Sequence, residues 1–362
     1  MFFSTKTKGY FIELSDYGCL LARTSTATAP FVVEAWESLP ANDEGALAEA
    51  LKRLQPKKSP SGYMHASVGF YPAKRIVRRA PVDMKRVKDP AYFGEVVSTQ
   101  FRVEPDKYAI AVLQANDGSD YDVNKATQKE ALFCGLPSED IAAFQERLLA
   151  AGIYPERIEL GSVAAMGGLV DYLTFKKSRT PTLVLEIGGD TTYTYIVSPA
   201  GVEAARPIQQ GLESMIPVVQ KELNLKDEES AKKLFYSNTF DFAGMGPLLI
   251  KKLLKELQSS IGFYEVQTGQ SIGQVLCTMI PPKLTWLDAT IANALGVPAL
   301  ELDLAAWLQS RQITISDQAA ATSLGPRWFG LLGLMTNYNL TTTTTAPAPA
   351  PTTNAVPAEK KA

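Results

Sequence analysis

The sequence contains a single histidine, His65, and only three cysteines, which stand far apart at Cys19, Cys134 and Cys277. A zinc site needs several clustered His or Cys ligands, and a Ser-His-Asp triad away from residue 65 would need a second histidine. An odd number of isolated cysteines gives no disulfide framework and is typical of small buried side chains in a reducing compartment. The composition therefore disfavours metalloproteins, triad hydrolases and disulfide-stapled domains.

An excess of one charge and long apolar runs are also missing. Lys and Arg number 36 against 38 Asp and Glu, so the formal net charge is only -2. A nearly neutral protein has no long-range field that would attract nucleic acid or an acidic membrane. The apolar run 328–335 is far shorter than the roughly 20 residues of a membrane span, and residues 1–6 lack the charged-then-apolar order of a secretory signal. The sequence therefore predicts a cytoplasmic protein that binds no nucleic acid.

One local concentration of positive charge does occur. It comprises Lys74, Arg75, Arg78, Arg79, Lys85, Arg86 and Lys88. Such a cluster is either a solvated rim or a surface for an acidic partner or for the membrane near a bound anchor. The sequence leaves both interpretations open.

The length and composition indicate two domains and a tail. A chain of 362 residues exceeds what one compact core usually holds, and 46% hydrophobic with 20% charged residues is an ordinary globular balance. The basic, turn-rich residues 176–181 form a reasonable domain boundary. Residues 341–362 are rich in Thr, Pro and Ala and have almost nothing to bury, so we expect disorder there. A Pro-rich spacer or docking tail is the alternative.

One supersecondary unit occurs twice. Residues 9–24 read as an apolar strand with one acidic residue, Glu13, a turn around Asp16, and a second apolar strand. Residues 183–197 repeat this pattern with Glu186 and a turn that contains Gly188 and Gly189. An internal repeat is stronger support for a duplicated fold than either copy alone.

The two turns suggest a phosphate site. In a duplicated fold the hairpins would face each other across a cleft, where backbone N–H groups hold phosphates and the carboxylates orient a hydrated magnesium ion. The candidate cofactor-binding residues are Glu13, Ser15, Asp16, Glu186, Gly188, Gly189, Asp190, Thr191, Thr192 and Gly211. On its own the Gly-Gly-Asp-Thr segment is a weak signal, because a β-hairpin without any ligand also accounts for it.

Several segments give a family resemblance over nearly the whole chain except the tail. They are LVLEIGGDTT at 183–192, RPIQQG at 206–211, LLAAGIYP at 148–155, IGFY at 261–264 and LLGL at 331–334. In this order and spacing the chain resembles the PilM proteins, which are actin-like proteins of the FtsA type.

The resemblance implies an α/β, actin-like fold of the duplicated ribonuclease H type, with two lobes. The first lobe would span 1–180, with an inserted subdomain at about 63–156. The second lobe would span 181–317, and a C-terminal helix in 318–340 would pack back on the core. As a PilM-like protein, the chain would bind the short N-terminal cytoplasmic segment of the inner-membrane protein PilN. It would then be peripheral to the inner membrane through this partner, and a homodimer is left open.

The family's nucleotide loops are altered in this chain. At the first hairpin, glutamate stands at position 13 where the family has aspartate, and Asp16 with Tyr17 fills the phosphate position. At the second hairpin, Glu186 replaces aspartate. Pro281 and Pro282 stand where the family has paired glycines on the adenine side, and they remove two backbone donors. ATP with magnesium would therefore bind weakly or not at all.

Three functional hypotheses remain. The first is a scaffold that docks a PilN-like peptide and has a degenerate nucleotide site and no catalytic residues. The second is an active actin-like ATPase that drives assembly or filament formation. The third is a small-molecule kinase of the same superfold, which would need a catalytic aspartate beside a sugar site, and the sequence offers no convincing candidate.

Overall fold

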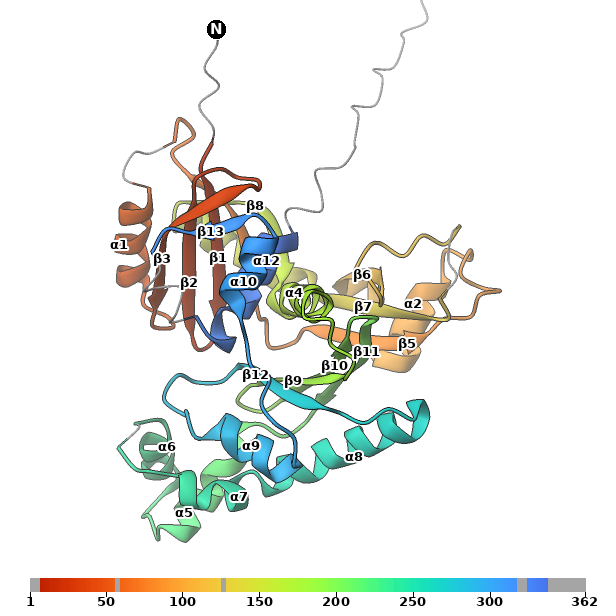
Figure 1. Cartoon of the computed structure of the whole chain (residues 1–362), viewed down its shortest axis with the longest axis vertical. Coiled ribbons are helices and arrows are strands. Elements are labelled where there is room, and N and C mark those ends of the chain that lie inside the picture. Colours follow the sequence, from red (N-terminus) through yellow and green to blue (C-terminus); the bar gives the residue numbers. More distant parts are fainter. Residues whose placement is uncertain (1–6, 56–58, 125–127, 238, 318–323, 338–362) are drawn as a thin grey trace, which may run out of the picture.

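The computed structural model describes residues 7–55, 59–124, 128–237, 239–317 and 324–337, so the predicted tail at 341–362 lies outside the described residues. The described residues form two lobes and an inserted sheet (Figure 1). The strands are β1 (Gly9–Ser15), β2 (Gly18–Thr24), β3 (Phe31–Leu39), β4 (Met64–Phe70), β5 (Ile76–Pro81), β6 (Tyr108–Gln114), β7 (Glu130–Pro137), β8 (Ile153–Leu160), β9 (Thr182–Ile187), β10 (Thr192–Ser198), β11 (Gly201–Ile208), β12 (Gln274–Met279) and β13 (Ile313–Ile315). The α-helices are α1 (Glu44–Leu54), α2 (Tyr92–Val96), α3 (Ser138–Ala150), α4 (Gly161–Phe175), α5 (Ile216–Glu222), α6 (Glu228–Ser237), α7 (Gly246–Leu249), α8 (Lys251–Thr268), α9 (Leu287–Leu295), α10 (Leu304–Ser310) and α12 (Phe329–Asn337).

The two lobes contain the same arrangement of strands. In the first lobe the order β3-β2-β1-β4 joins two antiparallel pairs to a parallel fourth strand, and the second lobe repeats it as β11-β10-β9-β12. The turn between β1 and β2 depends on Gly18, whose φ of 144° is unfavourable for residues with a side chain. The duplication read from the sequence is therefore present in the sheets themselves.

The first lobe is completed by the last described part of the chain. β13 pairs in parallel with β3 at the sheet edge, and α12 packs along α4. A Cβ atom added at Gly333 of α12 would lie 2.1 Å from the carbonyl oxygen of Ala164 on α4, so the two helix backbones are in direct contact. In the region where a C-terminal helix was expected, α12 spans Phe329–Asn337 and packs against α4. Residues 318–323 and 338–340 lie outside the described part.

The inserted unit is a three-stranded sheet with the order β5-β7-β6, covered by α2. It projects from the first lobe beside the second lobe (Figure 1). The span expected for this insert was about 63–156, but β4 and β8 both pair within the six-stranded sheet of the first lobe. The separate sheet therefore begins after β4 and ends before β8.

No helix among the described residues is long and apolar enough to cross a membrane. The same residues contain no group of three or more His, Cys, Asp or Glu side chains that could hold a metal ion. The three cysteines are free and buried.

Candidate functional site

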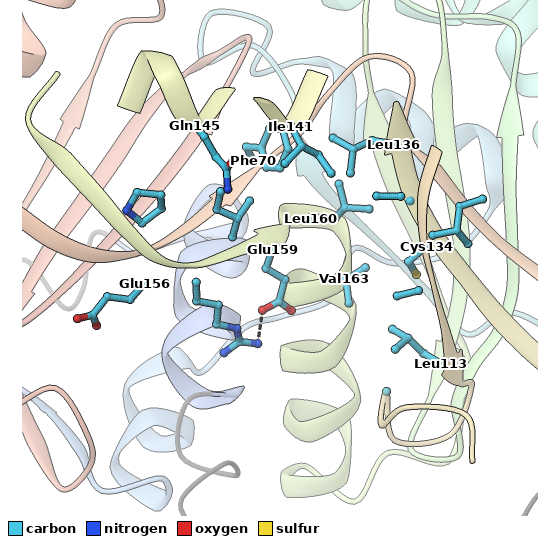
Figure 2. Close-up of a pocket in the computed structure, with 18 residues that line it drawn as sticks. Phe70, Leu113, Cys134, Leu136, Ile141, Gln145, Glu156, Glu159, Leu160 and Val163 are labelled. Atoms are coloured by element: carbon cyan, nitrogen blue, oxygen red, sulfur yellow. Dashed lines mark ion pairs between the residues drawn. The ribbon is translucent and has the colours of Figure 1, made fainter. Parts of the chain in front are cut away.

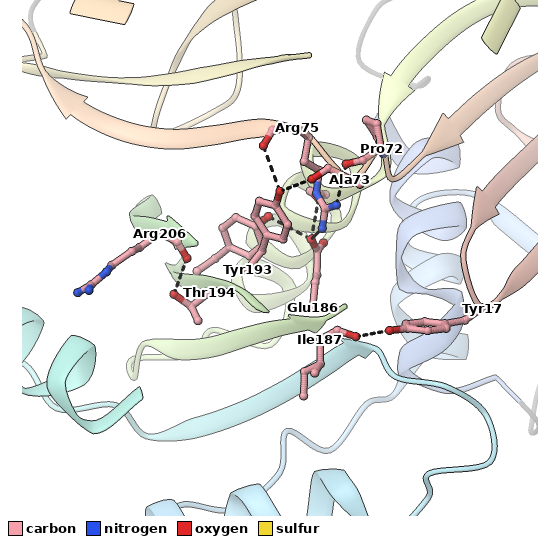
Figure 3. A network of polar contacts seen from close by, with 11 residues as sticks. Tyr17, Pro72, Ala73, Arg75, Glu186, Ile187, Tyr193, Thr194 and Arg206 are labelled. Carbon is pink, nitrogen blue, oxygen red and sulfur yellow. Dashed lines mark hydrogen bonds and ion pairs between the residues drawn. The ribbon is translucent and has the colours of Figure 1, made fainter. Parts of the chain in front are cut away.

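The turns of the two duplicated hairpins lie against each other. Tyr17, in the turn after β1, donates its phenolic hydrogen to the carbonyl oxygen of Ile187 at the end of β9, over 2.5 Å (Figure 3). The Tyr17 ring also packs against the hydrophobic core of the second lobe. Burial raises the pKa of this phenol, so it remains a hydrogen-bond donor at neutral pH. A side chain of the first lobe thus bridges the gap between the two turns.

Glu13, the acidic residue of the first hairpin, is paired with an arginine. Its side chain is 1% exposed, and Arg327 Nη1 donates to its Oε1 over 2.6 Å. Arg327 also donates to the hydroxyl of Ser15 over 3.1 Å and to the carbonyl oxygen of Gly18 over 3.4 Å. Both Glu13 and Ser15, which we expected to face a nucleotide, are therefore held by one guanidinium group.

Glu186, the acidic residue of the second hairpin, has an arginine of its own. Arg75 Nη2 lies 2.8 Å from Glu186 Oε2, and the two side chains are 8% and 1% exposed. Ser162 donates to the same carboxylate oxygen over 2.7 Å, and Tyr195 donates over 3.1 Å. The Arg75 guanidinium lies 3.7 Å from the ring centroid of Tyr193, in a cation–π contact (Figure 3).

The two ion pairs, Glu13–Arg327 and Glu186–Arg75, interact electrostatically. Burial raises the pKa of Glu13; Arg327 opposes this rise, and the negative charge of Glu186 adds to it. The remaining oxygens, Oε2 of Glu13 and Oε1 of Glu186, are buried and have no hydrogen-bond partner among the described residues. A Cβ atom at Gly330 would lie 2.2 Å from Glu13 Oε2 and 2.3 Å from the Tyr71 hydroxyl, so these groups form one crowded polar cluster.

Main-chain groups of the second turn are hydrogen-bonded to nearby main-chain groups of the protein. The Gly188 N–H donates to the carbonyl oxygen of Thr191 over 2.9 Å. The carbonyl oxygens of Gly188 and Gly189 accept from the N–H groups of Leu212 and Glu213, over 3.0 and 2.9 Å. The turn is thereby fixed to the segment that follows β11.

The other predicted site residues of this turn divide into two groups. Thr192 is buried and donates to the carbonyl oxygen of Gln210 over 2.7 Å, and a Cβ at Gly211 would lie 2.3 Å from the Gly189 carbonyl oxygen. Both therefore have structural roles. Asp190 and Asp16 are exposed on the two turns, where both add negative charge.

These contacts do not fit a magnesium nucleotide. Each carboxylate that would orient a hydrated magnesium ion is already neutralised by a guanidinium group within 3 Å, so neither carboxylate offers a divalent cation an uncompensated negative charge. Tyr17 lies between the two turns, in the space where the phosphates of a nucleotide would bind. The structure places all ten predicted residues at or beside the two turns, but it directs most of their polar atoms toward the protein itself.

The roles of Arg75 and Arg327 were not recognised from the sequence. Arg75 belongs to the basic cluster, for which one interpretation was a solvated rim; that interpretation is wrong for Arg75, whose side chain is 8% exposed. Arg327 follows Gly325-Pro326 and precedes an apolar helix, a position where a lone arginine is easily overlooked. A buried carboxylate in each hairpin was the available signal, because buried charges require partners.

The single histidine lies between a serine and a glutamate, the residue types of a catalytic triad. His65 Nε2 lies 2.9 Å from the Ser61 hydroxyl, and its Nδ1 lies 3.1 Å from Glu156 Oε1. His65 and Glu156 are 40% and 47% exposed, and Ser61 is exposed and lines neither cavity described below. The serine therefore lies outside both of these cavities.

A groove lies between the insert and the first lobe (Figure 2). It has a volume of about 690 Å³. Mainly apolar side chains line it: Ala111 and Leu113 of β6, Leu136 of β7, Ile141 of α3, Leu160 of β8 and Val163 of α4. An ion pair between Arg157 and Glu159 also lies in its wall. The β6 and β8 strands, which border it, are the edge strands of their two sheets.

The comparisons with known proteins identify the fold. A chain of the solved PilM-PilN type IV pilus biogenesis complex is similar with a TM-score of 0.64 and 17% identity, over 92% of this chain and 99% of that chain. The cytoplasmic domain of EpsL, an inner-membrane component of the type II secretion system of Vibrio cholerae, gives a TM-score of 0.42 at 10% identity, over 93% and 97% of the two chains. The ethanolamine utilization protein EutJ of Carboxydothermus hydrogenoformans gives 0.43 at 11% identity, over 91% and 90%. The last two scores are too low to support any argument.

No protein-family model matches the sequence, and no protein of curated function matches it significantly. At 17% identity, the likeness to the PilM-PilN structure concerns the fold alone. The chain therefore has the two-lobed actin-like fold that the sequence predicted, in the arrangement that is seen in the PilM-PilN complex.

Proposed function

We propose that this chain is a scaffold of type IV pilus assembly or of a related secretion system, and that it binds the N-terminal cytoplasmic segment of a PilN-like inner-membrane protein. The observation that carries the proposal is the apolar groove between β6 and β8. The similarity to a chain of the PilM-PilN complex over 92% of the sequence supports it. The protein would then be cytoplasmic and held at the inner membrane by its partner.

The groove suits a short extended peptide. An edge strand offers unpaired backbone groups to an added strand, and apolar pockets beside it select side chains. The outer edge of β6 pairs with Ser119 and Tyr121 only at its end, through Gln114 and Val112. The stretch 108–111 has β7 on one side and no second strand among the described residues. Ala109 and Ala111 are exposed there, so a peptide could approach the strand closely.

Binding of a synthetic N-terminal peptide of a PilN-like protein tests this proposal. We expect the wild-type chain to bind it, and Ala111→Trp to abolish binding because the indole would fill the groove. Ala289→Trp, at an exposed position on α9 of the second lobe, is the matched control and should bind normally. Failure of the wild type to bind would reject the function, whereas normal binding by Ala111→Trp would reject only the location.

We also propose that this role needs no nucleotide turnover. The support is the neutralisation of Glu13 and Glu186 by arginines and the position of Tyr17 between the turns. The second candidate is an active actin-like ATPase. Isothermal titration with ATP and magnesium separates the two, because micromolar binding with phosphate release would favour the ATPase and reject the degenerate site.

A further inference from the structure

A second apolar surface lies on the C-terminal half of α8. Phe263 is 66% exposed and Val266 is 89% exposed, the two highest values among the exposed large hydrophobic side chains. The opposite side of this helix is buried through Leu253, Leu257 and Tyr264. Because packing already uses that side, the exposed pair contributes nothing to the core. Neighbouring apolar side chains at the surface of a folded domain often mark an interaction site.

This surface borders a second cavity. The cavity has a volume of about 720 Å³ and is lined by α8, by β10 and β11 of the second lobe, and by the inserted sheet. Ile261 and Phe263 line it from α8. This cavity is separate from the groove described above, which lies along β6. It lies where β5 contacts β11, and Arg79 of β5 donates there to the Val202 carbonyl oxygen.

The wall formed by β11 is a sheet edge. Among the described strands β11 pairs with β10 alone, and β5 of the insert packs beside β11 without pairing with it. On its outer side, the Val202 N–H donates to the Ala115 carbonyl oxygen over 2.7 Å. Between Glu203 and Arg206 no other described residue bonds to the outer edge. Backbone groups are therefore available beside the exposed apolar side chains.

Positive charge exceeds negative charge among the residues that line this cavity. Glu130 pairs with Arg79, whereas Glu203 keeps its charge and accepts the hydroxyl of Tyr264 over 2.5 Å. Arg206 and Lys129 also line the cavity, and neither forms an ion pair with a described residue. Arg206 is exposed and points away from the polar network (Figure 3). An occupant with carboxylates would complement these two cations.

We propose that the α8–β11 surface is a second docking site, which takes an extended acidic segment of another protein. The segment adds to the outer edge of β11, covers Phe263 and Val266 with apolar side chains, and pairs its carboxylates with Arg206 and Lys129. In an extended segment, alternate side chains point to opposite sides, so one face can be apolar and the other acidic. This site goes beyond the proposed function, because it is independent of the groove at β6.

A random peptide library displayed on phage, selected against the full chain, tests the proposal without a known partner. We expect the selected peptides to alternate apolar and acidic residues. In fluorescence anisotropy with one selected peptide, Arg206→Glu and Phe263→Ser should each weaken binding about tenfold or more, as expected for a central charge or an aromatic anchor. Lys221→Glu, an exposed lysine on α5 that does not line the cavity, is the matched charge-reversal control.

Three outcomes would overturn this docking site. One is a selection that yields no acidic peptides, and another is peptides that lose affinity with Ala111→Trp but not with Arg206→Glu, because they then occupy the other groove. The third is a wild-type dimer that dissociates on Phe263→Ser, which would make a second copy of the chain the occupant. Binding of the PilN-like peptide to the groove at β6 should be unchanged in Phe263→Ser, so failure here leaves the proposed function intact.

Discussion

Replacing Arg327 by methionine would leave the Glu13 carboxylate buried without its cation. Glu13 is 1% exposed and Arg327 is 21% exposed. Breaking a buried ion pair costs about 3–5 kcal/mol, because the remaining charge stays desolvated. Since water reaches part of Arg327, we expect the lower end, about 3 kcal/mol near neutral pH. Urea unfolding followed by tryptophan fluorescence measures it, because Trp328 lies next to Arg327 and its ring centroid is 5.3 Å from that of Trp36.

The cost should depend on pH in a defined direction. The pKa of Glu13 in the folded wild type is raised above its ordinary value of 4.5 by burial, and Arg327 limits this rise. A carboxyl group with a raised folded pKa contributes stability that is full below its unfolded pKa and is lost as pH rises through the folded pKa. Without Arg327 the folded pKa of Glu13 rises further. The deficit of the variant should therefore be largest well above that pKa and shrink as the pH falls toward about 5.

Two companion variants make the result interpretable. Arg53→Met removes the partner of Glu37 from an exposed pair, in which Arg53 is 59% exposed, and should cost much less than Arg327→Met because solvent screens the pair. The double variant Glu13→Gln with Arg327→Met removes both charges and should be more stable than Arg327→Met alone. The reasoning is wrong if Arg327→Met lowers the free energy of unfolding no more than Arg53→Met does. It is also wrong if the loss caused by Arg327→Met is the same near neutral pH as at about pH 5.

Further predictions concern the interlobe contact, helix packing and the thiols. Tyr17→Phe removes the donor to the Ile187 carbonyl oxygen and should lower the free energy of unfolding by about 1 kcal/mol in urea titrations; an unchanged value would mean that water replaces the phenol. Gly333→Ala should destabilise by about 1–3 kcal/mol, because its Cβ would meet the α4 backbone at 2.1 Å, whereas Gly262→Ala on α8, with no atom within 4 Å, should stabilise by about 0.5–1 kcal/mol; equal melting shifts would contradict this. Thiol titration with a disulfide reagent should be slow until the protein unfolds, because burial raises the pKa of all three thiols, to about 12 for Cys19, and fast labelling in the native state would contradict the buried positions.

The two hairpins, and the facing of their turns, could be predicted from the sequence. Both copies show strand residues around a polar turn, and the structure forms β1 with β2 and β9 with β10 at these places. This information is local, since alternating burial and a turn glycine are encoded within about 15 residues. The facing of the two turns followed from the duplicated fold, and the bond from Tyr17 to Ile187 confirms it.

The partners of the buried carboxylates were not accessible in the same way. Arg75 and Glu186 are 111 residues apart in the chain, and Arg327 and Glu13 are 314 apart. Nothing near either arginine distinguishes it from a surface residue, because its burial is decided by tertiary packing. For the same reason the short strand β13, three residues long, could not be read from its own sequence and depends on its pairing with β3.

The closure of the first lobe by β13 and α12 has a consequence for biosynthesis. The sheet of the second lobe uses residues from Thr182 to Met279, and its core also includes α9, so this lobe can assemble before β13 and α12 have been made. The first lobe, although its early strands emerge first, lacks an edge strand, the helix that covers α4 and the cation for Glu13 until residue 337 has left the ribosome. Half-made chains would therefore expose the face of α4 that α12 later covers, which makes this face a natural point of contact for chaperones during synthesis.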